Sequence, residues 1–181
     1  MKTAARNAAV VVLVMGAMAC GTSGWAQSSQ GSATIISNAE TQKVWEAIEP
    51  GVHDDKLVKG VDTHGSAGNI GLSVIHYQPT TTKWNGEASE HTKVTEVFYV
   101  LKGSATMALG GEFDGAPTAS RTSPLFGPTV SGKAKGYKLQ KIAAGDSVIL
   151  PPNTLHNFVE IPEHLDFIVY RIDPEKSTTA K

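Results

Sequence analysis

Downstream of residue 54, runs rich in β-branched and aromatic residues recur between turns made of Gly, Pro and Asn, a pattern typical of β-strands. The expected strands cover 56–61, 69–77, 95–101, 104–109, 147–150, 156–161 and 165–172. Lys102-Gly103 is expected to turn a hairpin between the third and fourth of these runs. Many short strands separated by such turns predict an all-β sandwich or barrel.

Two segments depart from this rhythm. Ser37 and Glu40 have the spacing of a helix-capping box, and the positions after them predict a short helix over about 39–48. Residues 110–136 are rich in Gly, Ser, Thr and Pro and show no lasting period, so they are expected to form one long loop. The loop is either a surface insertion or a lid over the barrel mouth.

The N-terminal segment has the features of an export signal. Lys2 and Arg6 precede an apolar run over 8–19, and Gly24-Trp25-Ala26 places small residues where a signal peptidase reads them. We expect 1–26 to be a signal peptide cleaved near Ala26, which makes the protein secreted or periplasmic. A membrane anchor is the alternative, and lipidation of Cys20 is another, which would hold the protein at a membrane.

Composition sets the domain boundaries and excludes some kinds of chemistry and partner. We expect a flexible leader over 27–36, one domain over 37–173 and a polar tail over 174–181. Cys20 is the only cysteine, so cleavage near Ala26 leaves a chain without disulfide or thiol chemistry. The formal net charge of -1, from 16 basic and 17 acidic residues, argues against a nucleic-acid partner, because binding to nucleic acid needs a clustered basic face.

Two motifs carry the candidate chemistry. The first runs from His91 through Glu96 to Gly103, and the second from Gly145 through Pro151 to His156. Their order and spacing resemble the paired motifs of the cupin superfamily over roughly 69–172. The resemblance implies a double-stranded β-helix (a jelly-roll barrel of the RmlC-like type) with a short N-terminal helix, and it implies a homodimer.

The same resemblance implies a metal site with one departure. The family pattern places metal ligands at His91, Glu96 and His156, but Ser89 stands where a further histidine is usual. A fourth ligand could come from His76, Glu87 or Glu90, although none has the expected position. Asn153 replaces a glycine of the second motif, which is a mild change because Asn tolerates left-handed backbone. Glu160 replaces its late asparagine.

The residue types are coherent without the family. Two imidazoles and one carboxylate with free coordination positions are the ligand set of non-haem iron oxygenases. We therefore expect one divalent metal, with iron or manganese favoured and nickel or zinc as alternatives. Strand parity places Glu96, Phe98 and Val100 on one face and Tyr99 on the other, which predicts an apolar cavity with the metal at its base.

Each candidate ligand also has a plain structural explanation. His91 could be a surface histidine, His156 a turn residue, and Glu96 a solvated strand charge. A glutamate opening the apolar run 97–101 is costly unless it is paired or metal-bound, which favours the site.

Two functions follow from this site. The first is a metal-dependent enzyme acting on a small organic molecule by dioxygen insertion, isomerisation or hydrolysis. For this enzyme, Glu160 and Tyr99 are candidate acid–base groups. The second is an exported protein that binds a sugar or other small ligand without chemistry. The motifs alone leave both open, because one fold supports many functions.

Overall fold

The structure, a computed structural model, describes residues 33–179. These residues form one helix, α1 (Asn38–Glu46), and eleven strands joined in a single sheet. The strands are β1 (Asp54–Asp62), β2 (Asn69–Tyr77), β3 (Glu87–His91), β4 (Thr95–Leu109), β5 (Glu112–Phe113), β6 (Ala119–Ser123), β7 (Gly127–Lys135), β8 (Lys138–Ala143), β9 (Ser147–Leu150), β10 (His156–Glu160) and β11 (Leu165–Asp173). The expected all-β class with a short N-terminal helix is confirmed.

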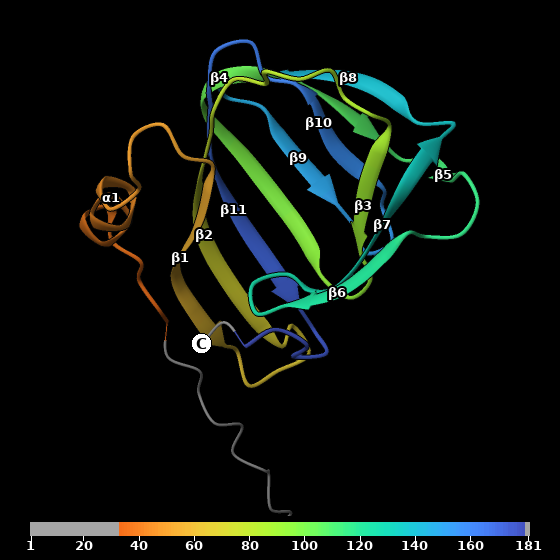
Figure 1. Cartoon of the computed structure of the whole chain (residues 1–181). Coiled ribbons are helices and arrows are strands. Elements are labelled where there is room, and N and C mark those ends of the chain that lie inside the picture. Colours follow the sequence, from red (N-terminus) through yellow and green to blue (C-terminus); the bar gives the residue numbers. More distant parts are fainter. Residues whose placement is uncertain (1–32, 180–181) are drawn as a thin grey trace, which may run out of the picture. The chain divides into compact units, whose positions relative to one another are not determined.

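Helix α1 begins where the capping box predicts. The Ser37 side chain accepts a hydrogen bond from the Glu40 backbone N–H, and the Glu40 carboxylate accepts from the Ser37 N–H at 2.8 Å. This reciprocal pair satisfies two backbone donors that a helix otherwise leaves open. The helix packs on β1 and β2 only, at the side of the sheet and away from β3 and β7 (Figure 1).

Strand β4 connects the two halves of the barrel. Its first part pairs with β11 and β9, and its last part pairs with β10 and β8. The order β1-β2-β11-β4-β10-β3-β7 therefore wraps continuously, and β3 and β7 face β2 and β11 across the interior (Figure 1). Closure of this kind leaves few open strand edges.

The predicted hairpin at Lys102-Gly103 is wrong, because β4 runs straight through these residues. Gly103 has a φ of 77°, and a Cβ there would stand 1.8 Å from the carbonyl oxygen of His164. A register shift against β11 lies two residues earlier, where the register skips Leu101. The glycine therefore permits a close backbone approach beside a bulge, which gives the same sequence signal as a turn.

The prediction of one long loop over 110–136 is also wrong. The segment contains β5, β6 and all of β7, and β7 pairs with β3, β5 and β6. Its Gly- and Ser-rich sequence has little strand propensity of its own, so pairing with β3 decides its conformation. The sequence also failed to predict β3 and β8.

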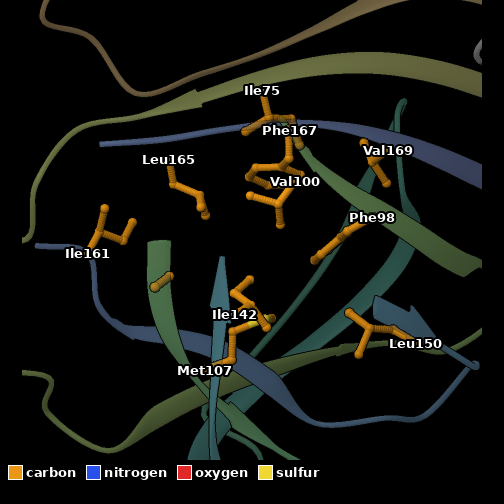
Figure 2. Packing of buried hydrophobic residues seen from close by; sticks show 11 residues of the cluster. Ile75, Phe98, Val100, Met107, Ile142, Leu150, Ile161, Leu165, Phe167 and Val169 are labelled. Atoms are coloured by element: carbon orange, nitrogen blue, oxygen red, sulfur yellow. The ribbon is translucent and has the colours of Figure 1, made fainter. Parts of the chain in front are cut away.

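Figure 2 shows the hydrophobic core between the two halves. Phe167 and Val169 of β11 meet Phe98 and Val100 of β4, and Met107 comes from the far end of β4. All five side chains are buried. Inward positions alternate along both strands, so the face that carries Glu96 continues directly into this core.

The expected signal peptide (1–26), its alternatives at Cys20, and residues 27–32 of the expected leader lie outside the described residues. The expected polar tail packs against the domain at Thr178. This residue is buried and donates to the Asp173 carboxylate through its N–H at 2.7 Å and its hydroxyl at 2.8 Å. Within 33–179, no helix is long and apolar enough to cross a membrane.

Candidate metal centre

The structure brings the three predicted ligands together from three strands. His91 ends β3, Glu96 is the second residue of β4 and His156 begins β10. His91 Nε2 lies 3.4 Å and His156 Nε2 lies 3.7 Å from Glu96 Oε2. One ligand atom from each residue falls within 4.8 Å of the others, and no other such group occurs in the described part of the chain.

His91 is oriented by β7. Its Nδ1 lies 2.8 Å from the Thr129 hydroxyl, which in turn donates to the Gly127 carbonyl oxygen at 3.3 Å. Because the hydroxyl hydrogen is used there, the hydroxyl accepts from Nδ1–H, and the lone pair of His91 is left on Nε2. A second partner of this kind fixes the tautomer and ring orientation of a metal-binding histidine.

His156 is oriented in the same way by its own turn. Its Nδ1 lies 2.9 Å from the Thr154 carbonyl oxygen, which only accepts, so Nδ1 carries the hydrogen and Nε2 carries the lone pair. Burial lowers the pKa of His156, which favours the neutral imidazole that a metal needs. The turn itself is tied to the other motif, because the Asn153 N–H donates to the His91 carbonyl at 2.9 Å. Asn153 has a φ of 61°, in the left-handed region expected for it.

Glu96 is held by a buried arginine. Arg171 faces Glu96 across β11 and β4 and donates from Nε to Glu96 Oε1 at 2.7 Å. Burial alone would raise the pKa of Glu96, but the hydrogen bond to His91 and the charge of Arg171 outweigh it and hold the pKa at about 2. One carboxylate oxygen is thus fixed by Arg171, and the other, Oε2, points to the two histidines.

Arg171 also forms a fork with Asp55. Its Nη1 and Nη2 lie 3.2 Å and 2.6 Å from the two Asp55 oxygens, and Nη1 donates to the Ser73 hydroxyl at 3.0 Å. The Arg171 side chain is only 6% exposed. The guanidinium therefore has every carboxylate oxygen of Asp55 and one of Glu96 as partners.

The arrangement fits a cation. Two imidazole nitrogens and an anionic oxygen converge, and a bound cation would replace any proton that His91 Nε2 shares with Glu96 Oε2. Ligands about 2.1 Å from a shared ion stand roughly 3.0–3.4 Å apart at octahedral or tetrahedral angles. The two separations from Glu96 Oε2 are at or just above this range, and all three ligand atoms lie within 4.8 Å of one another.

A cavity of about 210 Å³ opens onto these atoms. Phe98 lines it, as predicted, but Val100 does not, and eight of its fourteen lining residues are polar or charged, so the prediction of an apolar cavity is wrong. Its lining residues are Asp55, Ile75, Tyr77, Ser89, His91, Glu96, Phe98, Arg121, Phe126, His156, Asn157, Phe158, Phe167 and Arg171. The volume is below the roughly 300–1,000 Å³ of drug-sized ligand sites, so the cavity suits a small molecule.

The three suggested fourth ligands lie elsewhere. His76 Nδ1 lies 2.5 Å from the Asp166 carboxylate, and its ring is on the opposite face of β2 from Ile75, which lines the cavity. Glu87 and Glu90 do not line the cavity either. Ser89 does line it, but its hydroxyl is 2.7 Å from the Ser131 hydroxyl.

The two candidate acid–base residues are also outside the cavity. Tyr99 points outward, as strand parity predicts, and is 43% exposed. Glu160 is exposed because a register shift between Phe158 and Glu160 breaks the alternation of β10. Parity alone had placed Glu160 on the face of His156, and a bulge of this kind has no reliable sequence signal.

Sequence reasoning missed three charged residues of the site: Asp55, Arg121 and Arg171. Arg171 had a usable signal, because a charge near the end of the largely apolar run 165–172 requires a partner if it is buried. Arg121 had none, since it lies in the segment expected to be a loop. Phe126 packs on His91, with ring centroids 4.9 Å apart, and comes from the same segment.

No family model matches the sequence, and no curated protein matches it. Solved structures do. A Bacillus halodurans protein is 11% identical, with a TM-score of 0.50 over 82% of this chain and 88% of its own. A Klebsiella pneumoniae protein with a double-stranded β-helix domain is 17% identical, with a TM-score of 0.46, and the match covers 80% of this chain and 93% of that protein. An oxalate oxidase in complex with glycolate is 15% identical, with a TM-score of 0.47, and the match covers 82% of this chain and 64% of that enzyme. These likenesses, all below 25% identity, concern the fold alone, which is the double-stranded β-helix that the sequence resemblance implied.

Proposed function

We propose that this cupin-fold chain binds one divalent metal through His91 Nε2, Glu96 Oε2 and His156 Nε2, and uses it to act on a small organic molecule. The observation that supports this is the convergence of two oriented imidazole lone pairs and one anionic oxygen at the wall of a cavity. Three protein ligands leave coordination positions free for a substrate, water or dioxygen. Iron or manganese is the preferred ion, with nickel or zinc as alternatives.

The bound ion would polarise a carbonyl or hydroxyl oxygen, or activate water. The chain's own contribution is to orient the ligands and to keep water out. Thr129 and the Thr154 carbonyl fix the two histidines, and Arg171 fixes Glu96. Phe98, Phe158 and Phe167 pack against one another along the cavity and give the substrate an apolar wall.

A non-catalytic binding protein is the second candidate, and one observation favours it. Apart from the metal ligands, the cavity offers no free acid or base near neutral pH. Burial raises the pKa of the Tyr77 hydroxyl well above its usual range, and Asp55 is bound on both oxygens by Arg171. Any proton transfer would therefore depend on groups bound to the metal.

Metal content decides the first part of the proposal. We expect the purified protein to carry close to one equivalent of iron or manganese, measured by plasma mass spectrometry after growth with each ion. His91→Ala and His156→Ala should each lose the metal while keeping the β-rich circular dichroism spectrum. His64→Asn is the matched control, because His64 is exposed and Asn tolerates its φ of 54°.

Turnover separates the two candidates. Oxygen uptake or product formation that disappears in both histidine variants supports the enzyme. Stoichiometric metal and measurable ligand binding without turnover support the binding protein. Folded wild-type protein that takes up no divalent ion under any loading condition contradicts both metal-based candidates.

We also propose that the protein is exported and forms a homodimer. Tyr99, Ile149 and Tyr170 lie on the outward face of three adjacent strands and are 43%, 66% and 40% exposed. An exposed apolar sheet face can pair with a second copy of itself by two-fold symmetry. Sedimentation should give a dimer for the wild type and a monomer for Ile149→Lys; a wild-type monomer at micromolar concentration contradicts it.

A further inference from the structure

Arg121 is a cation at the cavity that the proposed metal site does not use. It lies in β6 and lines the same cavity as the three ligands. Its guanidinium carbon stands 5.6 Å from the centre of the Phe126 ring, and the Phe126 ring packs on the His91 imidazole. One aromatic ring thus separates the charge of Arg121 from the metal centre.

The guanidinium of Arg121 has no carboxylate partner within residues 33–179. None of the hydrogen bonds or ion pairs found there involves it, and its contact is the face of Phe126. The two carboxylates of the cavity are already occupied, since Asp55 and Glu96 both bind Arg171. The five donors of Arg121 therefore face solvent and the cavity mouth.

Charge counting shows which occupant the cavity favours. Two carboxylates and two guanidinium groups line it, so its formal charge is zero with neutral histidines. A divalent ion raises this to plus two, with one positive centre at the base and another at Arg121. An uncharged ligand would leave both charges uncompensated in a site with aromatic walls, whereas an anion compensates them.

Size and geometry restrict the anion. A cavity of about 210 Å³ has room for about seven water-sized groups. A planar carboxylate matches the fork of a guanidinium, and a small acid leaves an oxygen free to point toward the ligands. A large phosphorylated or aromatic anion would exceed this volume.

From these observations, and resting on the proposed metal site, we propose that the ligand is a small carboxylic acid of a few carbon atoms. Its carboxylate pairs with Arg121 at the cavity mouth, and the remainder of the molecule lies toward His91, Glu96 and His156. Arg121 is thus a specificity-determining residue, whereas Arg171 holds Glu96 and does not meet the ligand's charge.

The test uses cobalt(II)-loaded protein, in which visible absorption and calorimetry report ligand binding at the metal. The probes are acetate, lactate and malonate, with lactamide as the neutral match of lactate and inorganic phosphate as the competing anion. Variants are Arg121→Gln and Arg121→Lys. Lys138→Gln is the matched control, because it removes one exposed positive charge from β8 outside the cavity.

We expect at least one carboxylate to bind the wild type and the Lys138→Gln control equally, and to bind Arg121→Gln roughly tenfold more weakly. Lysine should restore part of the affinity, and lactamide should not bind. Cobalt uptake should be the same in all four proteins.

Three outcomes would overturn the inference: carboxylate affinity that is unchanged in Arg121→Gln, equal binding of lactamide, or binding of phosphate alone. Each leaves the metal site intact, so each is distinguishable from failure of the proposed function. Absence of cobalt uptake by the wild type would instead overturn both.

Discussion

Replacing Arg171 with methionine tests how the site is held together before any metal arrives. The change removes a buried guanidinium that donates to Glu96, Asp55 and Ser73, and methionine keeps much of its volume. Glu96 and Asp55 are then two carboxylates without a counter-charge, and their side chains are only 3% and 17% exposed.

The expected loss of stability follows because two buried carboxylates have no counter-charge. Removing one partner of a buried ion pair costs about 3–5 kcal/mol of unfolding free energy. For a domain of this size, that loss lowers the melting temperature by roughly 10 °C. Burial without Arg171 should also raise the pKa of Glu96, so the variant should bind metal more weakly near neutral pH because the carboxyl competes with protons.

Urea denaturation of metal-free protein at pH 7 measures the loss. Arg171→Met with Asp55→Asn removes one stranded charge and should recover part of it. Lys93→Met is the matched control, because Lys93 pairs with Glu175 at an exposed site and should cost less than about 1 kcal/mol. A loss for Arg171→Met as small as that of the control would refute the reasoning.

Three further predictions follow from the same geometry. Because the folded pKa of Glu96 is about 2 against an unfolded value of 4.5, this carboxyl contributes about 3 kcal/mol of stability that is fully present above pH 4.5 and is lost as pH falls from 4.5 to 2. Urea titrations of metal-free protein at several pH values should show that loss, and Glu96→Gln should reduce it. If the two proteins lose the same stability between pH 4.5 and 2, Glu96 is not the group responsible. Thr129→Val removes the acceptor of His91 Nδ1–H and should weaken metal binding about 10- to 100-fold by competition with a chromophoric chelator, whereas an unchanged affinity would exclude this role. Gly103→Ala should lower the unfolding free energy by about 3 kcal/mol or more in the same urea assay, because its Cβ would strike backbone atoms. Gly145→Ala is the control: its φ is 93° but the space around it is open, so it should cost only about 1–2 kcal/mol. Equal losses would show that the close backbone approach at Gly103 is unimportant.

The sequence predicted three side chains that the structure brings together, but it did not predict several strands of the sheet. His91, Glu96 and His156 were identified from motif spacing, because metal ligands must be particular residue types at fixed intervals. Strands β2 and β11 were also evident, since their apolar runs reflect burial that each strand needs by itself.

The features that the sequence did not predict depend on pairing between strands that are far apart in the chain. Strand β7 has the sequence of a loop and becomes a strand because β3 lies beside it. The bulge after Phe158 moves Glu160 out of the site, and the bulge near Gly103 turns an expected hairpin into one continuous strand. The contacts of Arg171 could not be predicted for the same reason, because its partners Glu96 and Asp55 come from other strands.

The segment between β4 and β8 separates the residues at the cavity entrance from the proposed metal ligands. Residues that would choose the ligand, Arg121 and Phe126, belong to β6 and the turn after it, whereas the proposed metal ligands stand on β3, β4 and β10. Substitutions in β6 and the turn after it would therefore change the ligand preference and leave the proposed metal ligands unchanged. Thr129 is the exception, because it shares β7 with that entrance and touches His91, so the route to new specificities should preserve this one threonine.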